Sequence, residues 1–400
     1  MKLQSLAKSM ESFVLKARAY LHANPELRWQ ENETIDFVRN GGRIGASENL
    51  TPLDIKIQDR YQGGLVVDLG FEKGLDRIIF RADIDALPVQ EETGLPYASV
   101  VPGKMHACGH DVHTAMLLGA YRALVTSRIK CKHNIRFVFQ RAEENPGTPP
   151  NPKSGGQTLV EEGVLEGISH AYGLHIWNSP DSTPGVFYSR PGPFMGNSGR
   201  LKIAVKASGG HVAKPSGGVN VLRITQAIQN TLDGYLARTL GPFEPAALEP
   251  AILKAGTGSN VMPAEAEMWY GVRTVLPGRM HELYMVEIEE TIRSVVFMFP
   301  GASVQFERIL GHPALINDTK SYKHVESVLL EANQITGFHE RILGGEDFAH
   351  YLDAEYGVPG SFWFLGARKD GTGDHHAPTF NPDESVFWKG VLFWLLLATN

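Results

Sequence analysis

The chain has 400 residues, of which 42% are hydrophobic and 20% charged, as expected for a globular protein of two or three domains. Its formal net charge of −6 argues against nucleic acid or an acidic membrane as the main partner. With only two cysteines, Cys108 and Cys131, a disulfide framework is excluded. A reducing compartment is therefore favoured, and we expect the protein in the cytoplasm because residues 1–8 lack the continuous apolar core of a signal peptide.

The first half of the chain alternates strand and helix patterns. Its apolar residues run together instead of alternating, which is typical of strands covered on both faces in a parallel or mixed sheet. Such strands are predicted at 64–70, 77–82, 134–140 and 171–176, with helices at 114–126 and 155–166. The Pro- and Gly-rich segment 145–156 reads as a loop. The alternation of strands and helices returns late in the chain, with a helix at 321–336, a strand at 362–365 and an apolar terminal helix. The terminal helix is too short to span a bilayer.

The middle of the chain follows a different order. It predicts strands at 200–207, 251–255, 265–275 and 303–309, and helices at 220–240 and 279–297. This β-α-β-β-α-β order is the ferredoxin-like arrangement. Pro and Gly clusters mark its two ends. We therefore predict an α/β domain with a mixed, mostly parallel sheet covered by helices, formed by 1–192 and 312–400, into which a ferredoxin-like α+β domain, 193–311, is inserted.

Residues that bind transition metals well recur in segments scattered along the chain, and the glutamate pair and His175 among them lie where predicted strands end. They are the segment Cys108-Gly109-His110, the pair Glu143-Glu144, His175, and the pair His375-His376. Asp83 and Asp85 follow another of these strands. Ligands of open α/β sheets bind beyond the carboxyl ends of the strands, so these side chains can share one site. Thiolate, imidazole and carboxylate are the ligands that zinc-like ions prefer.

Each of these segments has a simpler explanation when it is taken alone. Cys108 and His110 can be a buried thiol and a capping histidine, and a carboxylate pair at a strand end is usually solvated. His175 lies in an apolar context typical of a core histidine, and His375-His376 fits a surface turn. A nucleophilic Cys108 paired with a histidine is the main chemical alternative.

Taken together, the segments resemble the M20 metallopeptidase family, in its amidohydrolase branch of hippurate hydrolases, N-acyl-amino-acid amidohydrolases and plant auxin-conjugate hydrolases. The resemblance extends from 24–27 (NPEL) to 382–384 (PDE). Its motifs are 81–88 (RADIDALP), 105–113 (MHACGHDVH), 142–144 (AEE), 173–175 (GLH), 209–211 (GGH), 260–263 (NVMP), 345–348 (GEDF) and 376–378 (HAP). The chain departs from the family pattern at Arg141, where a proline is usual, and at Pro215-Ser216 and Asn220-Val221. We expect these changes to affect substrate preference more than catalysis.

The resemblance implies a di-metal exopeptidase-like catalytic domain and a satellite domain that acts as a lid and often mediates dimerisation. It gives Glu143 the role of general acid and base. The histidine His211 resembles the residue that polarises the scissile carbonyl, often from the partner subunit, and Asn260 and Arg273 resemble substrate-binding residues. The metal ligands that it implies are Cys108, His110, Glu144, His175 and His376, the last preferred over His375 because it directly precedes the Ala-Pro pair.

The implied activity is metal-dependent hydrolysis of the amide bond of an N-acyl amino acid, giving a carboxylic acid and a free amino acid. Up to two divalent ions per subunit are expected, with zinc favoured over manganese, cobalt or nickel. The expected partners are a small-molecule substrate and a second copy of the chain, with no nucleic acid and no membrane. The alternatives are a dipeptidase or carboxypeptidase on the same scaffold, a Cys108 hydrolase, and a non-catalytic metal-binding homologue.

Overall fold

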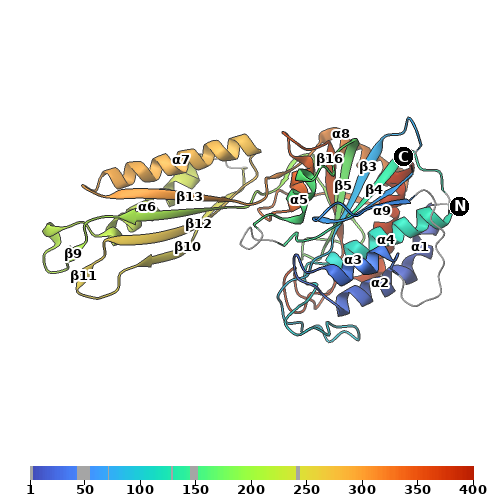
Figure 1. The fold of residues 1–400 in the computed structure, drawn as a ribbon, viewed down its shortest axis with the longest axis horizontal. Coiled ribbons are helices and arrows are strands. Elements are labelled where there is room, and N and C mark those ends of the chain that lie inside the picture. The colour runs from blue at the N-terminus through green and yellow to red at the C-terminus, as the bar shows by residue number, and fades with distance from the viewer. Residues whose placement is uncertain (1–2, 43–54, 71, 128, 145–151, 240–243) are drawn as a thin grey trace. The chain divides into compact units, whose positions relative to one another are not determined.

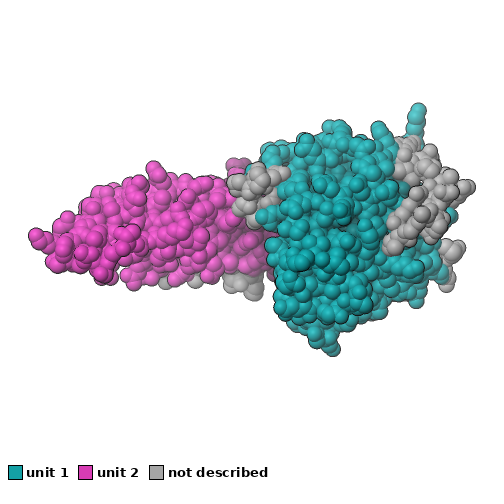
Figure 2. All heavy atoms as spheres, turned by 60° about the horizontal axis from the view of Figure 1, so that its bottom comes forward, with its two compact units in different colours: residues 1–192, 317–340, 350–400 teal, residues 193–316, 341–349 magenta. Residues whose placement is uncertain are grey.

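The computed structural model describes residues 3–42, 55–70, 72–127, 129–144, 152–239 and 244–400. Residues 145–151 of the expected loop lie outside this set. The chain divides into two compact units, which Figure 2 colours separately. Unit 1 comprises Met1–Gly192, Asn317–Glu340 and His350–Asn400, and unit 2 comprises Pro193–Ile316 and Arg341–Ala349. No helix among the described residues has the length and apolar character needed to cross a membrane.

Unit 1 is built on a mixed sheet (Figure 1). Among the described residues its eight strands lie in the order β1-β2-β4-β3-β5-β16-β6-β15. The neighbours β4, β3, β5 and β16 run parallel, and every residue of β4 and β16 is buried, as their continuous apolar sequences predict. The strands are β1 Ile55–Gln58, β2 Gly64–Leu69, β3 Arg77–Asp83, β4 Asn134–Gln140, β5 Ile168–Trp177, β6 Phe187–Ser189, β15 Thr336–Phe338 and β16 Gly360–Gly366.

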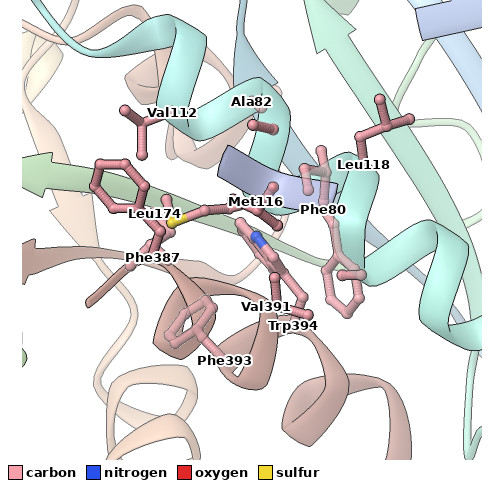
Figure 3. Packing of buried hydrophobic residues seen from close by; sticks show 14 of the residues in the cluster. Phe80, Ala82, Val112, Met116, Leu118, Leu174, Phe387, Val391, Phe393 and Trp394 are labelled. Atoms are coloured by element: carbon pink, nitrogen blue, oxygen red, sulfur yellow. The ribbon is translucent and has the colours of Figure 1, made fainter. Parts of the chain in front are cut away.

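Helices pack against this sheet and enclose its main core. The terminal apolar segment forms a helix, α9, that packs on α4, as expected (Figure 3). Trp394 of α9 lies 4.9 Å from Phe80 of β3 between ring centroids. A Cβ added at Gly390 would lie 2.1 Å from the sulfur of Met116, so glycine lets the Met116 side chain of α4 pack directly against the backbone of α9. The helices of unit 1 are α1 Leu3–Ser9, α2 Glu11–Ala23, α3 Asn32–Arg39, α4 His110–Ser127, α5 Gly155–Glu161, α8 Thr319–Glu331 and α9 Phe387–Thr399.

Two predicted helices end earlier than their sequence patterns suggest. Helix α5 stops at Glu161 because Gly163 adopts φ +85°, and α8 stops at Glu331 because Asn333 adopts φ +56°. Left-handed residues just beyond a helix are a common way to end it. In contrast, α4 begins at His110, earlier than predicted, which places His110 and His113 in its first turn.

Unit 2 has the ferredoxin-like architecture predicted from its element order. Among its described residues, four antiparallel strands lie in the order β10-β12-β8-β13, and α6 and α7 share a core with them. In β8, Leu201, Ile203 and Val205 alternate into that core, as a strand with one covered face requires. Its elements are β8 Gly199–Lys206, α6 Val221–Thr239, β10 Ala246–Ala255, β12 Glu265–Thr274, α7 Gly278–Phe297 and β13 Ser303–Leu310, with β9 Gly210–His211 paired to β11 Val261–Met262. The short strands β7 Gly192–Met195 and β14 Leu315–Asn317 pair separately.

Candidate metal centre

The parallel strands of unit 1 bring the predicted ligands to one place. Because β3, β4 and β5 run parallel as neighbours, their carboxyl ends lie at the same edge of the sheet, and α4 begins there. Three overlapping groups have ligand atoms within 4.8 Å of one another. They are Cys108 with His110 and His175, Cys108 with Glu144 and His376, and His110 with Glu143 and Glu144. All five predicted ligands and Glu143 therefore lie in one cluster.

The turn before α4 presents Cys108 and His110 to this cluster. Gly109 between them adopts φ +98°, and a Cβ there would lie 2.5 Å from Cδ1 of Ile176, so glycine is required. The sulfur of Cys108 lies 3.5 Å from Nε2 of His175. This spacing lets both atoms contact one ion.

Hydrogen bonds fix which ring nitrogen each histidine offers. Nδ1 of His175 donates to the carbonyl of Ile176 at 2.5 Å, and Nδ1 of His110 donates to the carbonyl of Asp85 at 2.9 Å. When the ring is neutral, as a metal ligand must be, Nε2 therefore carries the lone pair. Among the described residues, Nε2 of His110 is buried and has no hydrogen-bond partner. A buried polar atom of this kind fits a metal ligand better than a structural group.

Asp85 connects residues from two other segments of the chain. Its carboxylate accepts the backbone N–H groups of Glu143, at 3.1 Å, and Glu144, at 2.9 Å, and Oδ1 lies 3.2 Å from Nδ1 of His110. Burial raises the pKa of Asp85, while the hydrogen bonds from His110 and Glu144 favour the ionised form. Asp85 thus holds the glutamate pair and His110 in fixed relation.

Two non-glycine residues at the site have left-handed backbone conformations. Ala142, just before the glutamate pair, adopts φ +51°, and His376 adopts φ +67°. The buried carboxyl of Glu31 accepts the N–H of Ala142 at 2.8 Å, and the N–H of His376 donates to the carbonyl of Ala107 at 2.8 Å. Such strained residues persist only where their surroundings hold them, and they gather at functional sites.

The site has an excess of negative charge. Burial lowers the pKa of His110, but the carboxylates of Asp83 and Asp85 outweigh burial and raise it to about 10. Nε2 of His376 lies 3.1 Å from Oε1 of Glu144, which raises the pKa of His376. The cluster therefore favours positive charge, whether a proton or a metal cation supplies it.

The environment of Cys108 argues against a nucleophilic cysteine. Burial, together with the charges of Glu144 and Glu143, raises the pKa of its thiol well above the usual value. Reactive cysteines need the opposite environment, one that stabilises the thiolate through nearby positive charge. A metal ion would supply that charge. The donor set of thiolate, imidazole and carboxylate thus fits a divalent transition metal.

The sequence did not reveal every residue that shapes this cluster. His113 donates from Nδ1 to Asp83 at 2.6 Å and accepts the N–H of Ile176 at Nε2 at 2.9 Å, so it ties α4 to the strand that carries His175. The pairing of Glu31 with Ala142 was also missed. The positions of Asp83 and Asp85 after a buried strand were a usable signal, but their hydrogen-bond partners come from distant segments.

The remaining predicted residues belong to unit 2. His211 and Asn260 are exposed neighbours, since His211 pairs with Val261 and the N–H of Val212 donates to the carbonyl of Asn260. Arg273 lies near the other end of β12, where burial and the charge of Arg200 lower its pKa. Within unit 2, the structure thus brings His211 and Asn260 together but not Arg273.

The chain is similar to several known proteins over almost its whole length. The sequence signature of Peptidase family M20/M25/M40 matches residues 79–400. The N-acetylcysteine deacetylase of Bacillus subtilis is 33% identical over 98% of this chain and 97% of its own length. Thermostable carboxypeptidase 2 of Saccharolobus solfataricus is 31% identical over 99% and 97%. The crystal structure of B. subtilis YxeP, described as a dinuclear metal-binding peptidase of the M20 family, superposes with a TM-score of 0.82 at 30% identity and 98% coverage of both chains.

Proposed function

Because this chain belongs to peptidase family M20/M25/M40, we propose that it hydrolyses the amide bond of N-acyl amino acids. The products are a carboxylic acid and a free amino acid. The gathering of a thiol, imidazoles and carboxylates around Glu143 is the observation that carries this proposal. Relatives named for deacetylation and for carboxypeptidase activity both support a metal-dependent enzyme that acts on amides.

The proposed ligands are Cys108, His110, Glu144, His175 and His376. Each of Cys108, His110 and Glu144 belongs to two of the three groups named above, so these side chains would hold up to two divalent ions. A bound divalent metal lowers the pKa of water toward ~7 and polarises a carbonyl oxygen. Thiolate and imidazole favour zinc, although manganese, cobalt and nickel suit the same donors.

We assign the proton transfers to Glu143. Its carboxylate, at the end of β4 beside the ligands, takes a proton from the attacking water and delivers it to the nitrogen of the leaving amine. His211 supplies a hydrogen bond to the developing oxyanion. Its Nδ1 accepts the N–H of Ala213 at 3.0 Å, so the proton lies on Nε2, which can donate. We assign substrate binding to Asn260 and to Arg273, whose guanidinium suits the substrate carboxylate.

The geometry of unit 2 supports a homodimer in which two chains complete each site. Between Glu265 and Arg273, β12 advances by roughly 3.3 Å per residue, or about 26 Å in all. His211 and Asn260 lie beyond the Glu265 end, because β9 and β11 continue from there. An acyl amino acid is too short to contact both ends of β12 in one chain. We therefore propose that one substrate does not contact both His211 and Arg273 of the same chain, and that His211 acts at the site of the partner.

Mixing two inactive variants tests this arrangement. Each Glu143→Gln chain retains His211, and each His211→Ala chain retains Glu143. After subunit exchange, half of the dimers contain both chains and each has one intact site, so we expect about one quarter of wild-type activity. Each variant alone gives the background rate. If the mixture stays at background while mass spectrometry detects mixed dimers, His211 does not act across the interface.

A substrate and metal panel tests the activity itself. We expect purified protein to contain up to two divalent ions per chain by elemental analysis. We also expect it to hydrolyse acyl amino acids such as hippurate faster than dipeptides, to lose activity with a chelator, and to regain it with added metal. Faster cleavage of peptides from the carboxyl end would instead support the carboxypeptidase alternative, which the Saccharolobus relative favours. Activity that is independent of metal but abolished by alkylation of Cys108 would refute the proposal.

We place the enzyme in the cytoplasm on the basis of its cysteine content.

A further inference from the structure

His375, the neighbour of the proposed ligand His376, occupies a defined place beside Cys108. Its Nε2 lies 3.0 Å from the backbone nitrogen of Asn178, and its Nδ1 lies 4.0 Å from the sulfur of Cys108. The ring packs against Trp177 and Phe380, each 5.0 Å away between centroids. The imidazole is thus packed against two aromatic side chains, and Nδ1 is the ring nitrogen that lies near the thiol.

The backbone of Asn178 decides where the proton of His375 resides. A backbone N–H can only donate, so Nε2 of His375 must accept and therefore carries a lone pair. The ring is then neutral, and its single proton lies on Nδ1, the nitrogen that faces Cys108. This tautomer also makes Nδ1 unsuitable as a metal ligand, because only a nitrogen with a free lone pair can bind an ion.

The segment that carries His375 is itself fixed by Asn178. The Asn178 side chain is fully buried, donates to the carbonyl of Gly373 at 2.8 Å and accepts the N–H of Lys369 at 3.1 Å. Asn178 directly follows β5, the strand of His175. Consequently His375 keeps its orientation relative to the ligands through a contact that does not depend on a bound metal.

We propose that Nδ1–H of His375 donates a hydrogen bond to the thiolate of Cys108, so that His375 is a positioning residue that tunes the metal–sulfur bond. The inference rests on the proposed metal centre. A thiolate at this place has the carboxylate of Glu144 within 4.8 Å, and His375 is a neutral donor that can stabilise its charge. Donors to ligand atoms orient them and adjust their strength as ligands.

Cobalt-loaded protein tests the proposal without any measurement of activity. The apoprotein is titrated with Co²⁺ in competition with a chelator, and the thiolate-to-cobalt charge-transfer band is recorded for wild type and for His375→Phe, His375→Asn and His375→Gln. The side-chain amide of asparagine keeps an N–H near the position of Nδ1 of His375, which faces Cys108. The amide of glutamine lies instead near the position of Nε2. His339→Phe is the matched control, because His339 also packs against Trp177, 5.6 Å between centroids.

In the phenylalanine and glutamine variants, we expect Co²⁺ affinity to fall about 10- to 100-fold, the usual effect of losing a partner of a ligand. We also expect the band to move to longer wavelength, because an unbonded sulfur gives up electron density more easily. Asparagine should retain most of both properties, and His339→Phe should match wild type. An unmoved band in the phenylalanine and glutamine variants would overturn the inference, even if affinity fell, since His375 would then only support the loop. If wild type itself shows no thiolate band, the proposed metal centre fails instead.

Discussion

Replacing Glu143 with glutamine should reduce kcat by about 10²- to 10⁴-fold, the range that a general acid–base residue contributes. Glutamine preserves the shape of the side chain but cannot accept the proton of the attacking water. The backbone N–H of residue 143 still donates to Asp85, so the turn keeps its conformation. Metal content by elemental analysis should therefore equal that of wild type, and only steady-state turnover should change.

Two further variants serve as controls for the Glu143→Gln result. Glu144→Gln replaces a proposed ligand, so it should lose metal as well as turnover. Glu72→Gln alters an exposed carboxylate outside the cluster and should behave as wild type. If Glu143→Gln retained full turnover, Glu143 could not be the proton carrier. If it lost metal, Glu143 would be a ligand instead.

Replacing Asp85 with asparagine should weaken metal binding by about 10- to 100-fold, although Asp85 is not a proposed ligand. Its two carboxylate oxygens accept N–H groups from Glu143, Glu144 and His110. An asparagine keeps one acceptor and turns an NH₂ group toward one of these donors. The donor that faces this NH₂ group is then displaced, and with it the position of Glu144 or His110 as a proposed ligand. Competition with a chelator measures the resulting loss of metal affinity.

The control for Asp85→Asn is Asp370→Asn, which removes one negative charge at an exposed position. Equal losses in both variants would mean that overall charge, and not the hydrogen bonds of Asp85, governs affinity. Unchanged affinity in Asp85→Asn would show that the glutamate turn and His110 keep their positions without the carboxylate. Thermal unfolding of the apoproteins separates a local change at the site from general destabilisation.

Periodicity predicted the fold well wherever packing agrees with local pattern. The apolar runs of β3, β4 and β16 predicted buried strands, and the alternation in β8 predicted a sheet with one covered face. Helix ends were less predictable. At Asn333 a non-glycine residue adopts a left-handed conformation, which the sequence pattern does not reveal. The sequence also did not predict that residues 341–349 belong to unit 2. Which unit a segment joins depends on its contacts with residues far away in the chain.

The sequence by itself determined which side chains the protein offers for metal binding, the glutamate pair beside them, and the family. Residue type sets what a side chain can bind, and that property does not depend on folding. Only the tertiary structure decided how the groups are used. The hydrogen bond from the Asn178 backbone to His375 and those from two segments to Asp85 join residues far apart in the chain. Tautomers and carboxylate orientations follow from such contacts, which exist only once the parallel strands bring their ends together.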